Sequence, residues 1–126
     1  MQTERVKLLK RRVALAVATI VLAGVGAYWF QGSPFNATAW QDEAQVKDGV
    51  RLKMADRLVA RRTLKGKTRN EILALLGKPP PTEYFSDWDF VYWLGPERGF
   101  FSIDSEWLVL RLNRDGRVYD VQIVRD

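Results

Sequence analysis

The fold of this chain is decided by residues 66–79, GKTRNEILALLGKP, which have the pattern of a short helix with both ends specified. Thr68 and Glu71 form a capping box, in which the threonine hydroxyl accepts the backbone N–H of Glu71 and the carboxylate reaches back. Gly77 suits the left-handed residue that ends a helix, and Pro79 prevents its continuation. The apolar side chains at helical spacing are Ile72, Leu75 and Leu76. The sequence therefore predicts a helix that begins at Thr68 and ends before Gly77.

The flanking segments predict a second helix before this one and a sheet after it. Residues 48–62 carry apolar side chains at helical spacing, with Asp48 as the candidate cap and basic side chains on the other faces. After three consecutive prolines the apolar period changes to two, which is typical of half-buried strands. The three strands are expected within residues 88–94, 107–112 and 118–123. A turn at 113–116 contains Asp-Gly, and Trp88 and Trp93 fall on opposite faces of the first strand, so one should face the helices.

An uncharged run at residues 13–30 precedes this domain. As a helix it would be roughly 27 Å long, close to the hydrocarbon thickness of a bilayer. We therefore expect a transmembrane anchor. The residues predicted to lie at the membrane interface are Arg11, Arg12, Tyr28, Trp29 and Phe30.

The basic residues before the run predict a cytoplasmic N-terminus and a periplasmic C-terminal domain, in a bacterial inner membrane. The alternative is a signal peptide cleaved after Val25-Gly26-Ala27, which would release a soluble periplasmic protein. The expected division is a basic tail at 1–12, an anchor at 13–30, a linker at 31–47 and a domain at 48–126. The expected fold class is α+β: a transmembrane helix, then two helices packed on a three-stranded antiparallel sheet.

Composition narrows the range of functions. The chain has no Cys and no His, which excludes thiol nucleophiles, histidine triads and the usual zinc sites. The formal net charge is +5, but residues 1–12 hold five basic side chains and one acidic one, so most of that charge lies in the tail. We therefore expect no nucleic-acid binding, no cofactor, no metal and no enzymatic activity. The basic face of the helix expected at residues 48–62 suggests anionic lipid as an alternative partner.

The motif Gly66-x-Thr68, followed by Leu76-Gly77-x-Pro79, resembles the small lipoprotein family of the outer-membrane barrel-assembly machinery (BamE, or SmpA/OmlA). The later positions that carry the resemblance are Ile72, Trp88, Tyr92, Leu108, Leu110, Leu112, Gly116 and Val118. The resemblance implies two helices on an antiparallel sheet and a non-enzymatic module that binds proteins and lipids. The motif residues have folding roles, and they are Gly66, Thr68, Glu71, Gly77, Pro79 and Gly116. Without a lipid-modified Cys, the chain would be a non-lipidated relative.

The residue types in the loop at 95–107 are explained less well by folding requirements than those in any other segment. The loop brings Arg98 close in sequence to Glu97, Asp104 and Glu106, which suggests either a cation site or a local salt-bridge network. We favour the network, because the loop lacks the geometry of a known calcium site. The candidate partner-binding residues are Trp93, Arg98, Phe100, Phe101 and Trp107, since aromatic and arginine side chains are the usual interface anchors. The expected function is an accessory subunit that binds other membrane or periplasmic proteins.

Overall fold

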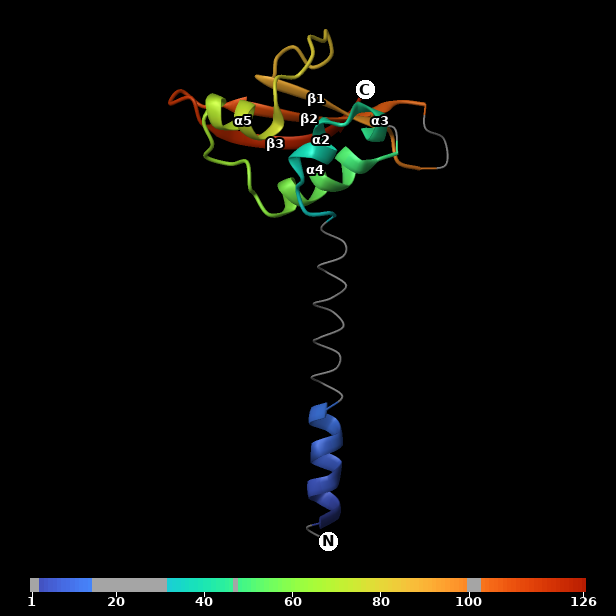
Figure 1. The fold of residues 1–126 in the computed structure, drawn as a ribbon. Coiled ribbons are helices and arrows are strands. Elements are labelled where there is room, and N and C mark those ends of the chain that lie inside the picture. The colour runs from blue at the N-terminus through green and yellow to red at the C-terminus, as the bar shows by residue number, and fades with distance from the viewer. Residues whose placement is uncertain (1–2, 15–31, 47, 100–102) are drawn as a thin grey trace. The chain divides into compact units, whose positions relative to one another are not determined.

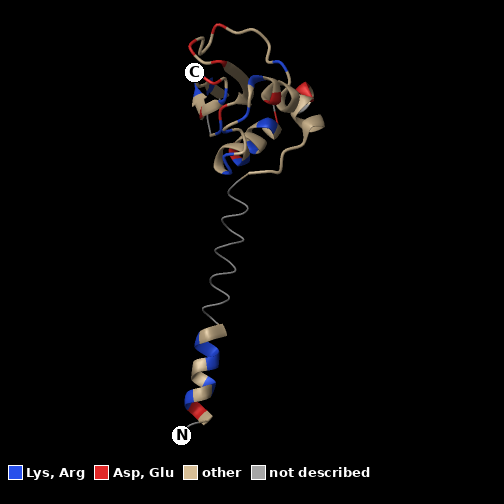
Figure 2. Ribbon diagram, turned by 90° about the vertical axis from the view of Figure 1, so that its left-hand side faces the viewer, with Lys and Arg blue, Asp and Glu red and all other residues tan. Residues whose placement is uncertain are grey.

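The structure is a computed structural model that describes residues 3–14, 32–46, 48–99 and 103–126 (Figure 1). The chain forms two compact units, residues 1–31 and residues 32–126. In the first unit, residues 3–14 are helical and exposed, and Lys and Arg dominate the charges on this helix (Figure 2). Arg11 and Arg12 belong to it. The predicted interface residues Tyr28, Trp29 and Phe30 lie outside the described residues.

The second unit consists of helices followed by a three-stranded antiparallel sheet (Figure 1). The helices are α2 (Ala37–Gln41), α3 (Glu43–Val46), α4 (Val50–Ala60) and α5 (Arg69–Leu76). The strands are β1 (Phe90–Pro96), β2 (Ser105–Leu112) and β3 (Val118–Arg125). They form a meander in the order β1-β2-β3, so β1 is an edge strand. The expected antiparallel sheet is therefore present.

The expected fold class was wrong in two respects. Four helices, not two, precede the sheet in the described part of the second unit. In addition, no helix among the described residues is both long and apolar enough to cross a membrane. That finding overturns the single-pass fold class and the inner-membrane localisation expected from residues 13–30. Only Val13 and Ala14 of that run belong to a described helix, at residues 3–14, whose other residues are rich in charge. Residues 15–30 lie outside the described part.

Helix α5 confirms the prediction from the capping pattern. The Thr68 hydroxyl accepts the N–H of Glu71 at 3.3 Å, and Gly77 ends the helix with a φ of 79°. The Glu71 carboxylate accepts a bond from the Thr68 hydroxyl at 3.2 Å, instead of bonding the backbone as expected. The segment before the helix is tied to β3, because Gly66 N–H donates to the Val118 carbonyl at 2.8 Å. The motif thus fixes both the start of α5 and its position beside the sheet.

The segment expected to be a linker contributes to the core. Residues 32–46 form α2 and α3, and Trp40 in α2 is fully buried. Its indole N–H donates to the Leu76 carbonyl at 3.0 Å, which joins α2 to the end of α5. Helix α4 begins after Gly49 with a left-handed φ of 78°, and Asp48, the expected cap, does not serve as one. The folded unit therefore begins well before residue 48.

The core lies between the helices and one face of the sheet. Along β1 and β2 the residues that face the helices alternate with residues on the far face. The buried core side chains are Trp40, Leu52, Met54, Ala55, Leu58, Leu64, Ile72, Leu76, Phe90, Tyr92, Leu94, Leu108, Leu110 and Val118. The helices thus leave the other face of the sheet to the loop that connects α5 with β1.

Candidate functional site

Two tryptophans lie directly opposite each other on the face of the sheet that points away from the helices. Trp93 in β1 pairs with Trp107 in β2. Their neighbours Tyr92 and Leu108 belong to the core on the helical side, so alternation places both indoles on the far face. Both tryptophans are only partly buried. This pair brings together two of the residues that the sequence proposed for partner binding.

The loop between α5 and β1 adds two more aromatic rings to this face. The ring of Tyr84 lies 5.4 Å from that of Trp107 between centroids, and the ring of Phe85 lies 6.1 Å from it. Phe85 has a φ of 52°, in the left-handed region that side chains rarely adopt, so the loop holds it in a strained conformation. Tyr84 is 55% exposed. We call Tyr84, Phe85, Trp93 and Trp107 the aromatic face.

Polar groups border the aromatic face and fix its geometry. The Trp107 indole N–H donates to the Asp126 carboxylate at 3.1 Å. Arg111 on β2 stacks over the ring of Trp88 at 4.0 Å and forms an ion pair with Asp87 at 2.7 Å. Trp88 lies before β1, and Arg111, which stacks on its ring, is on the same face of β2 as Trp107, so neither Trp88 nor Trp93 faces the helices. The expectation that one of them would do so was wrong.

Arg98 lies in a separate network at the end of the sheet. Its guanidinium donates two bonds of 3.1 Å to the nearly buried carboxylate of Glu106, and a third bond, of 2.5 Å, to Asp56 in α4. Arg125 in β3 forms ion pairs with Glu97 at 3.6 Å and with Glu106 at 3.7 Å. Through these contacts Arg98 has a structural role: it connects the loop with the sheet and with α4.

The charge of Glu106 is set by this network. Burial alone would raise the pKa of its carboxyl, but the hydrogen bonds and charge of Arg98, with the charge of Arg125, outweigh burial and lower it. Hydrogen bonds to Glu106 and Asp56 likewise raise the pKa of Arg98. Asp104, the third carboxylate expected near Arg98, contributes its backbone carbonyl to the N–H of Glu97 at 2.9 Å. The loop therefore forms the salt-bridge network that we favoured over a cation site.

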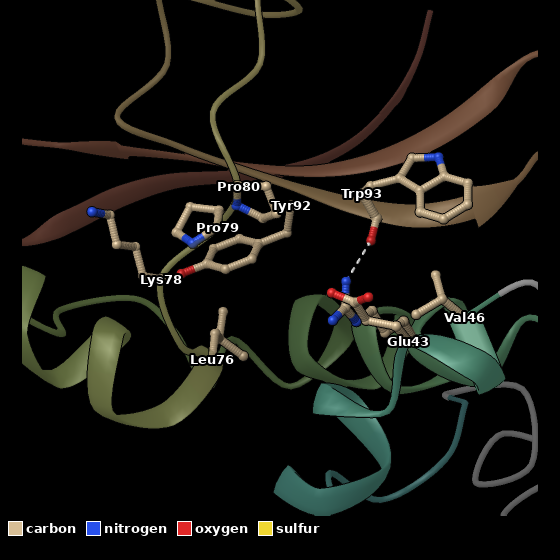
Figure 3. A pocket seen from close by; sticks show the side chains of 9 residues that line it. Glu43, Val46, Leu76, Lys78, Pro79, Pro80, Tyr92 and Trp93 are labelled. Carbon is tan, nitrogen blue, oxygen red and sulfur yellow. Dashed lines mark hydrogen bonds between the residues drawn. The ribbon is translucent and has the colours of Figure 1, made fainter.

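A cleft of about 330 Å³ opens between the helices and the edge strand β1 (Figure 3). Its lining residues are Glu43, Val46, Arg51, Leu76, Lys78, Pro79, Pro80, Tyr92 and Trp93. In Figure 3 the Tyr92 ring points from the strand into the cleft beside Pro79, whereas the Trp93 indole points away from it. Trp93 therefore contributes its backbone to the cleft and its side chain to the aromatic face.

Arg51 is the central polar group of this cleft. It donates from Nε to the Trp40 carbonyl at 2.5 Å and from a terminal nitrogen to the Trp93 carbonyl at 3.2 Å, the dashed line in Figure 3. Burial lowers the pKa of Arg51, and the charge of Glu43 partly offsets that effect. The Tyr92 hydroxyl donates to the Gly77 carbonyl at 2.7 Å, and burial raises its pKa. The cleft thus holds a positioned guanidinium between apolar walls.

The basic surface of α4 is smaller than the sequence predicted. Arg51 reaches into the cleft, and Arg57 is only 8% exposed. The basic residues of this segment that stay exposed are Lys53, Arg61 and Arg62. Sequence periodicity assigned all five to the outer faces, and it also missed Leu52, which is buried.

Of the remaining candidate residues, the structure describes only Arg98, which belongs to its own salt-bridge network. Phe100 and Phe101 lie outside the described residues, and Arg98 is apart from Trp93 and Trp107. Tyr84 was missed, although an adjacent Tyr-Phe pair in a polar loop is a usable signal for an exposed aromatic cluster. Arg51 was missed because nothing in its local sequence distinguishes it from a solvated helix arginine.

Comparison with known proteins found no matching family model, no matching curated protein and no matching solved structure.

Proposed function

We propose that the second unit is a non-enzymatic module that binds a protein partner through the aromatic face. The observation that carries this proposal is the Trp93–Trp107 pair, packed with Tyr84 and Phe85 on the side of the sheet that no described helix covers. Tryptophan and tyrosine are the most frequent hot-spot residues of protein interfaces, because each ring buries a large apolar area with little loss of conformational freedom.

The arrangement of this face also suits recognition. The rings are held by neighbouring contacts before any partner arrives: Trp107 by Asp126 and the two loop aromatics, and Phe85 by its strained backbone. A surface that is already ordered loses less entropy on binding than a flexible one. The polar border of Asp87, Arg111 and Asp126 can exclude water around the rings and orient the partner.

The same features argue against catalysis as the function. The chain has neither His nor Cys, and the carboxylates of Asp56 and Glu106 are bonded to Arg98. Acid–base chemistry needs groups whose protons are free to move near neutral pH, and a carboxylate held in its charged form by arginine is a poor candidate. The relation to the barrel-assembly lipoprotein family remains a proposal, supported by the capped α5 and the meander that follows it.

Affinity purification of the full-length tagged protein from its own cells tests the proposal. Co-purified proteins would be quantified by mass spectrometry for the unchanged chain, for Trp93→Ala and for Lys65→Ala, an exposed control outside the aromatic face. We expect one protein to be enriched with the unchanged chain and the control, and reduced at least ten-fold with Trp93→Ala, because truncating a hot-spot residue costs about 2 kcal/mol or more. Equal recovery with all three would contradict the proposal.

A further inference from the structure

The cleft beside β1 has features that the aromatic face does not explain. It lies at an edge strand, and the strand order β1-β2-β3 leaves the outer side of β1 without a neighbouring strand in the described part of the chain. Tyr92 and Trp93, two consecutive residues of β1, both line it. Trp93 turns its main chain toward the cleft, where its carbonyl accepts the bond from Arg51, whereas Tyr92 contributes its ring. The cleft therefore lies beside an edge strand, the kind of element that can bind an added strand.

Two segments with restricted backbones stand beside the cleft. In one, the backbone of α3 presses against β1, where a Cβ added to Gly95 would lie 2.6 Å from the Val46 carbonyl oxygen. Gly95 has a φ of 119°, so glycine is required there for both conformation and space. The other contains Pro79 and Pro80, whose φ angles are fixed by their rings.

The charges in the cleft favour one kind of occupant. Arg51 and Lys78 contribute two positive charges and Glu43 one negative charge. The guanidinium is aligned by two backbone carbonyls, those of Trp40 and Trp93. A guanidinium has five N–H donors in a planar arrangement that matches the geometry of a carboxylate.

We propose that the cleft binds an extended acidic peptide segment of the partner protein, whose backbone lies along β1 and whose carboxylate side chain reaches Arg51 and Lys78. This inference deepens the proposed function, on which it rests for the existence of a protein partner. The main chain of β1 supplies affinity that does not depend on sequence, and the charged group supplies the preference for Asp or Glu. Trp93 joins the two surfaces, because its carbonyl faces the cleft and its indole belongs to the aromatic face.

A fluorescence anisotropy titration with full-length protein tests this inference. The probe is a labelled, acetylated heptapeptide of alternating Val and Glu, and matched peptides carry Gln or Lys in place of Glu. We expect the Glu peptide to bind more tightly than the Gln peptide, and the Lys peptide not to bind. Raising the salt concentration should weaken the Glu peptide toward the affinity of the Gln peptide. Equal affinity for all three peptides would overturn the proposal.

Substitutions at exposed cleft residues locate the site, because Arg51→Gln would also remove two bonds that hold the fold. Lys78→Gln should weaken the Glu peptide about two- to five-fold, and Glu43→Gln should tighten it by a similar factor, as expected for charges at the rim. Both residues are exposed. Lys65→Gln, the matched control outside the cleft, should leave the affinity unchanged. If the control changes the affinity as much as Lys78→Gln, the cleft is not the site.

Two further arms separate this inference from other outcomes. Competition by N-acetylglutamate as strongly as by unlabelled heptapeptide would show a small-carboxylate site and overturn the pairing with β1. Trp93→Ala keeps the backbone carbonyl that faces the cleft, so peptide affinity should persist while the co-purified partner is lost. If Trp93→Ala loses the partner but the unchanged chain does not bind the peptide, the cleft proposal alone is refuted. If the unchanged chain binds the peptide but Trp93→Ala still recovers the partner, the aromatic-face proposal alone is refuted.

Discussion

Replacing Trp40 with alanine should remove a large part of the stability of the second unit. The side chain is fully buried, contacts the rings of Phe35 and Tyr92 at 6.0 Å between centroids, and donates to the Leu76 carbonyl. Truncation of a buried tryptophan to alanine costs about 3–5 kcal/mol, through lost burial and the cavity left behind. A domain of this size is stable by roughly 5–14 kcal/mol, so the loss should be at least about a fifth of the total.

Urea unfolding followed by far-UV circular dichroism measures this change, with Trp93→Ala as the matched control. Trp93 is only partly buried, on the other face of the sheet, and its pairing with Trp107 is worth up to about 1 kcal/mol, so with its lost burial the control should lose no more than about 2 kcal/mol. A loss below about 1 kcal/mol for Trp40→Ala, or one smaller than that of the control, would refute the reasoning that α2 is an integral part of the core.

Three further predictions concern the cap and two titrating groups. Thr68→Ala should lower the free energy of unfolding by about 1 kcal/mol through loss of the cap on α5, whereas Thr68→Ser should retain most of it, and urea unfolding would show equal losses if the cap is unimportant. The lowered pKa of Glu106 means that its contribution is present above its ordinary pKa of 4.5 and disappears as the pH falls through the lower folded value, so Glu106→Gln should flatten the acid limb of a stability–pH curve. The raised pKa of Tyr92 has the opposite consequence: stability should fall as the pH rises above its ordinary value of 10.0, and Tyr92→Phe should lack this alkaline loss, which thermal unfolding across pH would detect.

Sequence signals that act between residues a few positions apart were sufficient to predict a helix, a turn and the strands. The cap at Thr68 and the glycine at 77 predicted α5, because both act through bonds within a few residues. The turn at 113–116 was also correct: Gly116 N–H donates to the Asn113 carbonyl at 3.0 Å and has a φ of 75°. The period of two predicted the strands, although β1 begins at Phe90, two residues later than expected.

The remainder depended on contacts between distant residues. Residues 31–47 looked like a linker because their composition is polar and punctuated, yet Trp40 becomes core through a carbonyl that lies 36 residues away in sequence. Arg51 looked like a surface arginine, yet it bonds the Trp93 carbonyl in an edge strand. Alternation failed at Trp88, since the strand had not yet begun there. In each case the deciding partner lies on another element, which a pattern along the chain cannot reveal.

The aromatic loop shows the same limit for the candidate site. Trp93 and Trp107 were identified as binding candidates from residue type alone, and only the register of β1 and β2 places them opposite each other. Tyr84 and Phe85 join them because the loop after α5 folds over the far face of the sheet, where a strained Phe85 fixes its path. The sequence identified two of these aromatic residues as candidates, but it could not show that the four rings lie together.

The central claim, that the aromatic face contacts a protein partner, is tested most directly by site-specific photocrosslinking in the cells that make this protein. A photoreactive phenylalanine analogue would replace Tyr84, the most exposed ring of the face, and in a separate variant Lys65 as control. The account predicts a crosslinked product with one protein from position 84 and none from position 65. No product from position 84, or the same product from both positions, would contradict it.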